Sequence, residues 1–431
     1  MKKGQMNWWQ LSLLGVGCTI GTGFFLGSSM AIKNSGPAVI VAFVLAAAGT
    51  FIVYDSLASM SVDDPNKGSF RYYSQKAFGS WAGFSNGWVY AFSEILIMGS
   101  QLIALGIFTQ FWFPNVSLWL LCAIYGALGL LVILTGMKGF EKIEGLFGIM
   151  KTAAILMFIF VAVFLLVTFA GGESLIPSFN KTNLFSEGPT GVWHALIYAF
   201  YAFGGVEVMG LLVIDLKKPK EAPKAGRVMM IALTAIYIIS ISLILVLVSW
   251  QTIHADESPF ITALKPLSIP YVTDIFTGVF IIAGFSTMVA ALFAVLTILV
   301  SLAEDHHAPS IFQHHGKWNV PWPAFLCTTG GLVVSVIIAL VLPDRLFEYV
   351  TTAAGLMLLY NWMFILATFL KQKKQTGWQK IKPLIGMLLI TIAVSGTWVE
   401  KTSRIGFFVS FVFICFIALA TFLSRSTRQH G

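Results

Sequence analysis

Long uncharged apolar runs recur along the whole chain, and they constrain its fold more than any other feature. Several of them reach the roughly 20 residues that an α-helix needs to cross a bilayer. Hydrophobic residues make up 57% of the 431 residues and charged residues only 11%, a composition typical of membrane proteins. We therefore predict an all-α integral membrane protein with twelve transmembrane helices, at approximately residues 8–32, 37–60, 81–111, 117–137, 145–170, 191–214, 227–250, 274–303, 320–342, 346–370, 383–399 and 404–424.

The distribution of positive charge indicates the orientation in the membrane. With the N-terminus in the cytoplasm, most of the 27 lysines and arginines fall in cytoplasmic loops, for example at Lys217, Lys218 and Lys220. Cytoplasmic loops of membrane proteins carry such an excess. We expect a multi-pass protein of the cytoplasmic membrane with both termini in the cytoplasm. Because the loops are short, residues 1–431 are expected to form one transmembrane domain that binds no nucleic acid.

The first span contains a glycine-rich stretch, residues 15–29, which includes Gly21 and Gly23. Each glycine destabilises a helix interior by roughly 1 kcal/mol relative to alanine. Irregular backbone at membrane depth is tolerated only where it is buried in protein or lines a cavity. The stretch therefore predicts either a binding site made of freed backbone groups or close helix packing through small residues.

The sixth span contains a similar interruption, in which Gly204 and Gly205 precede Glu207. Interruptions at corresponding places in spans one and six are typical of transporters built from two inverted repeats of five helices. This pairing favours the binding-site interpretation of residues 15–29. We expect the first repeat at 8–170, the second at 191–370, and two additional helices at 383–424.

Four ionisable residues within the predicted spans are the main candidates for functional charges, because charges there are costly and typical of functional sites. Asp55 is near the end of its span and can reach the lipid headgroups. Glu94 lies deep in the third span, with a functional role and structural hydrogen bonding as alternatives. Lys151 is about two helical turns from a polar stretch, so it either extends to the membrane surface or is a buried functional cation. Glu207 lies in the interruption of the sixth span.

Several other kinds of site are not supported by the sequence. All four cysteines fall in apolar runs, which argues against a disulfide framework or a cysteine-based zinc site. The histidine pairs at 306–307 and 314–315 lack nearby cysteines or clustered carboxylates, so they are interpreted as polar loop residues rather than metal ligands. No nucleophile and base occur at a plausible spacing. We expect no enzyme activity, no metal and no cofactor.

Several segments, in order along the chain, resemble the amino-acid permeases of the amino acid, polyamine and organocation superfamily. Residues 21–27 resemble the first-helix signature of that family, and residues 201–207 resemble its sixth-helix pattern. Residues 65–70 and 83–88 are similar to its region between the second and third spans. Gln101 occupies the position of a glutamate found in one branch of the family.

The resemblance implies a LeuT-like inverted-repeat core with discontinuous helices 1 and 6 and a substrate site between them. Unpaired N–H groups near Thr22 would attract a carboxylate, and the carbonyl end of the first half of span six would attract an ammonium group. Both ends of a zwitterion are thus matched. The expected substrate-binding residues are Thr19, Ile20, Gly21, Thr22, Gly23, Phe200, Tyr201, Phe203 and Gly204.

The resemblance also implies roles in gating and coupling. Lys151 resembles a fifth-span lysine that replaces a sodium ion in several relatives, and it would act with Ser286 and Thr287. The expected gating residues are Tyr90, Tyr201, Glu207 and Tyr360. The expected side-chain pocket is mainly apolar, with candidates Ile97, Met98, Gln101, Phe203, Phe285 and Met288.

The function implied is that of a secondary active transporter, a permease for a neutral, apolar amino acid that works by alternating access. Transport is expected to be independent of sodium and either coupled to protons or exchanging, so the expected partners are the amino acid, the lipid bilayer and protons. A carrier of another small amine, such as a cationic amino acid or a polyamine, is the main alternative. A channel on the same scaffold would not need paired helix breaks with an aromatic gate, and a sensor would normally add a soluble output domain.

Overall fold

The computed structural model describes residues 4, 6–169, 185–267, 271–314, 320–341, 346–372 and 377–429. The predicted span ends at 170 and 342, and residue 315 of the second histidine pair, lie outside these ranges. Within them the chain is almost entirely helical, and the β-pairing consists of one isolated bridge between Met6 and Leu216. The sequence prediction of an all-α chain is confirmed.

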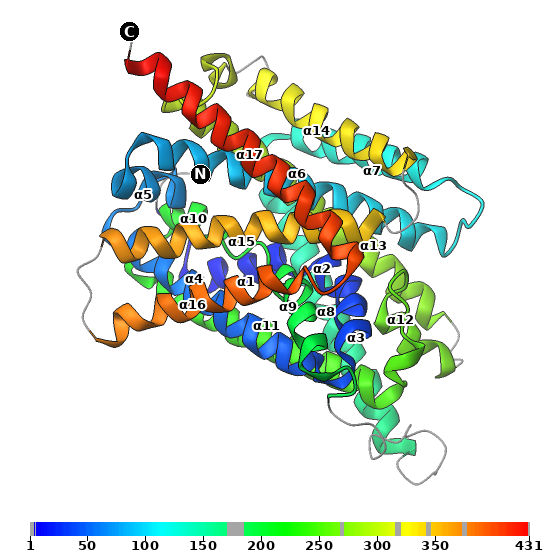
Figure 1. Cartoon of the computed structure of the whole chain (residues 1–431). Coiled ribbons are helices and arrows are strands. Elements are labelled where there is room, and N and C mark those ends of the chain that lie inside the picture. Colours follow the sequence, from blue (N-terminus) through cyan, green and yellow to red (C-terminus); the bar gives the residue numbers. More distant parts are fainter. Residues whose placement is uncertain are drawn as a thin grey trace.

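Figure 1 shows the helices in their order along the chain. Their bounds are α1 Trp8–Thr19, α2 Thr22–Phe25, α3 Gly27–Ser35, α4 Val39–Asp63, α5 Ser69–Phe78, α6 Ser80–Gln110, α7 Leu118–Leu134, α8 Gly136–Phe169, α9 Gly188–Tyr201, α10 Val208–Leu212, α11 Ala222–Leu247, α12 Pro259–Leu264, α13 Val272–Glu304, α14 Trp322–Val341, α15 Leu346–Gln372, α16 Trp378–Gly396 and α17 Lys401–Gln429.

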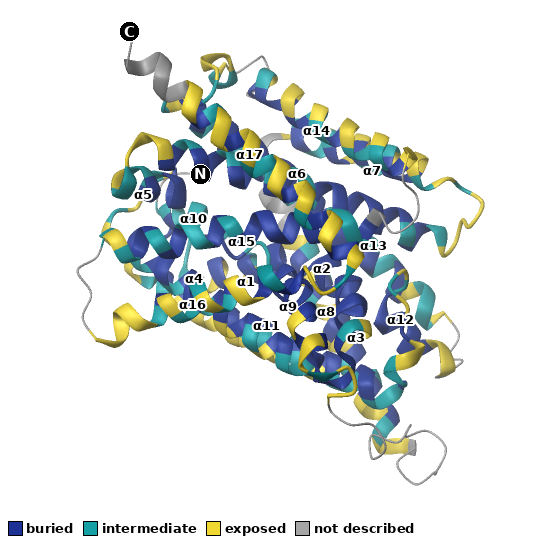
Figure 2. Ribbon diagram, viewed as in Figure 1, coloured by how far each residue is buried: buried dark blue, intermediate teal, exposed yellow. Residues whose placement is uncertain are grey.

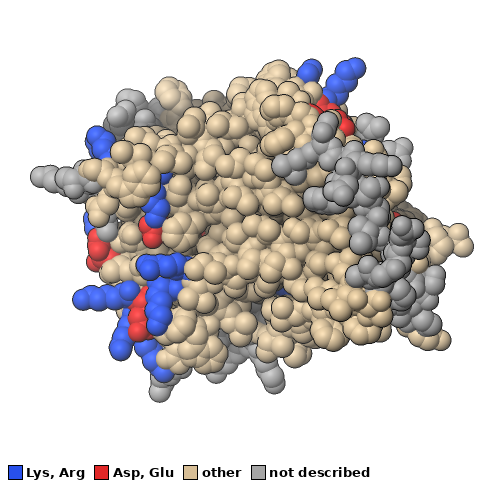
Figure 3. All heavy atoms as spheres, turned by 90° about the horizontal axis from the view of Figure 1, so that it is seen from below, with Lys and Arg blue, Asp and Glu red and all other residues tan. Residues whose placement is uncertain are grey.

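In the part of the chain that the structure describes, nine helical stretches are long and apolar enough to cross a membrane, and α7 is a shorter apolar helix. Large apolar side chains cover much of the exterior, with Phe160, Val167 and Phe422 more than two-thirds exposed. Figure 2 shows such exposed residues along the outer faces of α14 and α17. In the view of Figure 3 the charged side chains gather mainly at one edge, and a broad uncharged surface separates them from a smaller group. An exterior of this kind suits contact with lipid.

The two glycine-containing interruptions are real breaks in the helices. Helix α1 ends at Thr19, and the extended conformation of Ile20 and Gly21 separates it from α2. Helix α9 ends at Tyr201, and residues 202–207 form turns before α10 begins. Gly205 has a φ of +102°, a conformation that glycine adopts much more readily than residues with a side chain.

Helix α6 runs through the middle of the bundle, where α13 and α15 pack along it. Most of its deep side chains are buried, including Glu94, Met98 and Gln101. Helices α5 and α12 lie in segments where the sequence predicted no span. They have only 10 and 6 residues. Helices this short cannot cross a bilayer.

Asp55 is paired within the protein rather than with the surrounding headgroups. Its Oδ2 lies 2.6 Å from Nζ of Lys382, and both side chains are about one-quarter to one-third exposed. This ion pair connects α4 with α16, two helices that pack side by side. Asp55 therefore has a structural partner near the end of its helix.

Close packing of α4 against α11 generates a prediction about stability. A Cβ atom on Gly226 would collide with the ring of Tyr54, whereas a Cβ on the exposed Gly330 of α14 would meet nothing within 4 Å. We expect Gly226→Ala to destabilise the protein by about 1–3 kcal/mol, because the buried ring must move. Gly330→Ala is the matched control and should be neutral or slightly stabilising.

The measurement is the fraction of purified protein that stays monodisperse after heating in detergent, followed by size-exclusion chromatography. Equal melting temperatures for the two variants would contradict the packing described for α4 and α11.

Candidate functional site

A cavity lies where the two helix breaks face α6 and α13. The space inside it that a water-sized sphere can occupy is about 40 Å³, which is room for a few water molecules. The lining residues are Cys18, Thr19, Gly21, Gly23, Glu94, Ile97, Gln101, Tyr201, Gly204, Gly205, Val208, Thr287, Ala290 and Ala291. The cavity therefore combines backbone from both breaks with a few polar side chains and an apolar wall.

The two breaks are in direct contact with each other. A Cβ on Gly205 would lie 2.8 Å from the carbonyl oxygen of Cys18, and a Cβ on Gly23 would lie 3.1 Å from the ring of Tyr201. Side chains at these glycines would push the two segments apart. The glycines are thus needed for close approach of backbone to backbone.

At the first break, α6 supplies a partner for the start of α2. The side-chain oxygen of Gln101 accepts a hydrogen bond from the hydroxyl of Thr22 and lies 3.4 Å from its backbone nitrogen. A free N–H in this apolar interior would be costly. Gln101 therefore stabilises the irregular backbone and also lines the cavity.

The carbonyl end of α1 interacts with the side chain of Lys151. This lysine is fully buried, so it does not extend to the membrane surface. Its Nζ donates a hydrogen bond of 2.8 Å to the carbonyl oxygen of Gly17. Helix α8 carries Lys151 and packs against both α1 and α13, which places a cation beside the first break.

Glu207 terminates the second break and is fully buried. The backbone nitrogen of Gly205 lies 3.2 Å and 3.3 Å from its two carboxylate oxygens. The indole nitrogen of Trp362, on α15, donates to Oε2 at 3.2 Å. Both oxygens of Glu207 therefore face N–H donors, an arrangement that suits a carboxylate.

The structure brings several predicted residues together at the cavity. Of the expected substrate-binding residues, the lining includes Thr19, Gly21, Gly23, Tyr201 and Gly204. Thr287 lines it as well, and Ser286 is buried beside Thr287 on α13. Among the predicted pocket side chains, Ile97 and Gln101 belong to the lining.

Other predicted residues lie outside the lining. Ile20 and Thr22 are buried within the first break, and Phe200 packs against Trp362. Phe203 packs on Phe43 and Tyr237. The pocket candidates Met98, Phe285 and Met288 are also absent from the lining. Neighbouring helical residues point about 100° apart, so only some members of a run can face one cavity.

The predicted gating tyrosines are dispersed. Tyr90 is buried, and its ring packs on Phe70 with centroids 4.8 Å apart. The hydroxyl of Tyr360 pairs with Ser410 on α17 at 3.2 Å. The aromatic residue that contacts Glu207 is Trp362, whose indole N–H donates a hydrogen bond to it. Sequence reasoning missed Trp362, although it lies only two residues from Tyr360.

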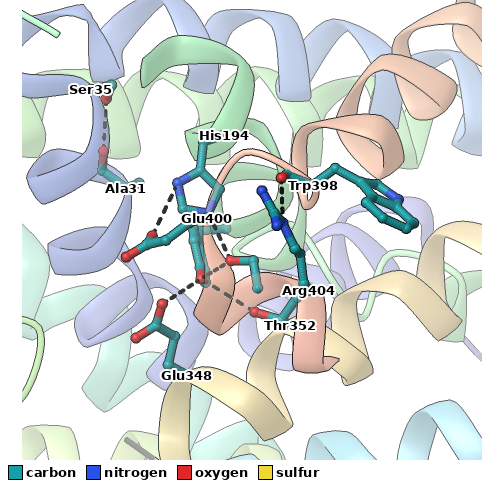
Figure 4. Close-up of polar contacts among 10 residues, drawn as sticks. Ala31, Ser35, His194, Glu348, Thr352, Trp398, Glu400 and Arg404 are labelled. Carbon is teal, nitrogen blue, oxygen red and sulfur yellow. Dashed lines mark hydrogen bonds and ion pairs between the residues drawn. The ribbon is translucent and has the colours of Figure 1, made fainter. Parts of the chain in front are cut away.

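The middle of α9 is held by a polar cluster (Figure 4). His194 lies 3.4 Å from Oε2 of Glu400 through Nδ1 and 2.7 Å from the hydroxyl of Ser403 through Nε2. The hydroxyl of Tyr198 contacts Ser403, Thr352 and Glu348 at 3.1–3.4 Å. These contacts connect α9 with α15 and with the start of α17.

A second polar cluster fixes α5 to the end of α13. The buried guanidinium of Arg71 binds Asp305 at 2.6 Å and Nδ1 of His307 at 3.3 Å, and Nε2 of His307 contacts Ser80 at 2.8 Å. Beside it, the hydrogen bond from Lys76 lowers the pKa of Asp64 below its usual value. In the ranges that the structure describes, no group of three or more His, Cys, Asp or Glu could hold a metal ion.

Comparisons with known proteins agree with this architecture. The model of the amino acid permease family matches residues 10–423. The chain is 53% identical to the uncharacterized transporter YcgH of Bacillus subtilis, over 99% of this chain and 96% of that protein. It is 30% identical to the aromatic amino acid transport protein AroP of Corynebacterium glutamicum (85% of this chain, 80% of that protein) and 28% identical to AroP of Escherichia coli strain K12 (93% and 87%).

The contact between the breaks generates a second prediction about stability. Gly205→Ala should destabilise the protein by about 1–3 kcal/mol, because alanine is strained at positive φ and its Cβ would collide with the Cys18 carbonyl. Gly27→Ala is the control, since a Cβ there meets its neighbours only at 3.9–4.0 Å. Thermal stability in detergent is the measurement. An unchanged melting temperature for Gly205→Ala would mean that the breaks are not held in this contact.

Proposed function

The chain belongs to the amino acid permease family and is a multi-pass membrane protein, and from this premise we propose that it carries a neutral, apolar amino acid across the cytoplasmic membrane by alternating access. The observation that supports the proposal is the meeting of two broken helices at a cavity. Such a cavity offers a zwitterion free backbone groups of both polarities. No nucleophile, metal or cofactor is part of the proposal, since the family consists of transporters rather than enzymes.

We assign twelve spans to the chain. Two are discontinuous, one made of α1 to α3 and the other of α9 and α10. The remaining ten are α4, α6, α7, α8, α11, α13, α14, α15, α16 and α17. In this assignment residues 8–170 and 191–370 are inverted repeats, α16 and α17 are additional, and both termini are cytoplasmic, in accord with the charge distribution.

The proposed substrate lies with its carboxylate at the backbone of Gly21 to Gly23 and its ammonium group at carbonyls near Thr19 and Gly204. Both segments line the same cavity. Its lining also includes Ile97, Ala290 and Ala291, which favours an uncharged side chain. Two relatives named as aromatic amino acid transport proteins make L-phenylalanine the first probe.

Lys151 is the proposed substitute for a sodium ion. Its ammonium group already binds the carbonyl of Gly17, a partner that a sodium ion would also use. In this proposal Ser286 and Thr287 complete the coupling site on α13, and the cycle needs no sodium. Tyr201 and Glu207 act as gates at the cavity, with Tyr90 and Tyr360 as more distant gating residues.

One observation favours a second candidate function. Glu94 is a carboxylate in the cavity wall, and a carboxylate there could bind a cationic side chain or a polyamine. Competition by L-lysine against labelled L-phenylalanine distinguishes the two candidates. Strong inhibition by lysine would support the cationic substrate.

The proposed function predicts transport activity for the purified protein. Purified protein in liposomes should take up labelled L-phenylalanine or another neutral amino acid with saturation, and uptake should be the same in sodium and in potassium buffers. Saturation follows from a single site that opens to one side at a time. Empty liposomes are the control. A flux that stays linear to very high concentration would indicate a channel.

A second prediction concerns Lys151. Lys151→Ala removes a charge-assisted hydrogen bond to the broken helix, and transport should fall by about tenfold to a hundredfold. Thr152→Ala is the matched control, because that hydroxyl bonds only within its own helix, to Gly148. Initial uptake rates at equal amounts of monodisperse protein are compared. Sodium-dependent uptake by the unmodified protein would refute the role given to Lys151.

A further inference from the structure

Two buried carboxylates lie beside the cavity without a cation. Glu94 is 4% exposed and Glu207 is fully buried, and the cavity that Glu94 lines is also lined by Gly205 and Val208, which flank Glu207. Among the residues that the structure describes, no lysine or arginine forms an ion pair with either carboxylate. Two neighbouring carboxylates in such a medium cannot both be ionised without a large cost. The pair must therefore hold a proton.

The hydrogen bonds indicate which carboxylate holds it. Both oxygens of Glu207 face the N–H of Gly205, and one also accepts from Trp362. These N–H groups can only donate, and hydrogen bonds from donors favour the ionised form of a carboxylate. The hydroxyl of Tyr90, one helical turn before Glu94 on α6, is buried and has no hydrogen-bond partner among the described residues, and a hydroxyl can accept as well as donate. The hydrogen bonds thus favour Glu94 over Glu207 as the site of the proton.

The remaining groups around Glu94 do not change this assignment. On α13, which packs along α6, the lining residues Thr287, Ala290 and Ala291 are uncharged. On α15, Tyr360 contacts Ser410 and Trp362 contacts Glu207. On α5, Arg71 is bound by Asp305. Helices α7, α14 and α17 contribute no residue to the cavity wall. The titratable groups that face Glu94 are Tyr90, Tyr201, Glu207 and Cys18.

We propose that Glu94 is the proton-binding residue of the carrier and that its proton crosses the membrane with the substrate. This inference rests on the transport function proposed above. With the cavity open to one side, Glu94 is protonated when substrate binds. With the cavity open to the cytoplasm, the O–H bond breaks, the proton leaves to water, and Glu94 becomes a carboxylate beside Glu207. Because Glu94 takes up the proton on one side of the membrane and releases it on the other, the proton gradient is coupled to the transport cycle.

The direct test is infrared difference spectroscopy of the purified protein in lipid between acidic and alkaline buffer. The unmodified protein should show the carbonyl band of a buried protonated carboxylic acid. Glu94→Gln should lose the band, and Glu94→Asp should keep a carbonyl band at a shifted frequency. Persistence of the unshifted band in Glu94→Gln would overturn the assignment of the proton to Glu94.

The second test measures coupling in liposomes with labelled L-phenylalanine. An inward pH gradient should drive accumulation by the unmodified protein. Glu94→Gln should still exchange internal for external substrate but should not accumulate it. Glu94→Asp should restore accumulation. Accumulation by Glu94→Gln would overturn the proposal. So would inhibition by L-lysine that disappears in Glu94→Gln, because Glu94 would then recognise a cation.

The two tests separate this inference from the proposed function. If the unmodified protein transports no neutral amino acid, the proposed function fails. The infrared spectrum still decides whether Glu94 is protonated. If Glu94→Gln is not monodisperse, the spectrum of Glu94→Asp decides, since a shifted carbonyl band supports the assignment and an unchanged band overturns it.

Discussion

The contact between two interrupted helices is the constraint on which the rest of the structure depends. Helices α1 and α9 end inside an apolar interior, where free backbone groups need partners. The partners come from elsewhere in the bundle: Lys151 on α8 binds the carbonyl of Gly17, and Gln101 on α6 binds the start of α2. The cavity is therefore a product of the whole helix packing, because neither break could be buried alone.

The four buried or partly buried charges of the spans are accommodated in different ways. Asp55 has a lysine partner near a helix end, Lys151 has a backbone carbonyl, and Glu207 has N–H donors. Glu94 has neither a cation nor an N–H donor among the described residues. A buried carboxylate in that position is stable only with a proton, which is why we connect it with coupling rather than with structure.

The sequence predicted some parts of this protein much better than others. Apolar runs gave the helices closely, as for α6, predicted at 81–111 and observed at Ser80–Gln110, because hydrophobic length has a direct physical limit in a bilayer. The family resemblance is confirmed by the match over residues 10–423. The short helices α5 and α12 were missed because they cannot span. The orientation of side chains was harder: Phe203 faces Tyr237 rather than the cavity, and Trp362 rather than Tyr360 reaches Glu207.

The sequence by itself determined that the chain is a helical membrane protein, where its helices weaken, and which few charges lie within them. These properties depend on hydrophobicity and on glycine, and both act locally. Only the tertiary structure decided that Gly205 lies against Cys18, that Lys151 is directed at the first break, and that Glu94 lines the same cavity as the segment that carries Glu207. Such contacts join residues far apart in the chain, and they depend on how each helix is rotated about its axis, which the apolar pattern of an almost wholly apolar helix does not specify.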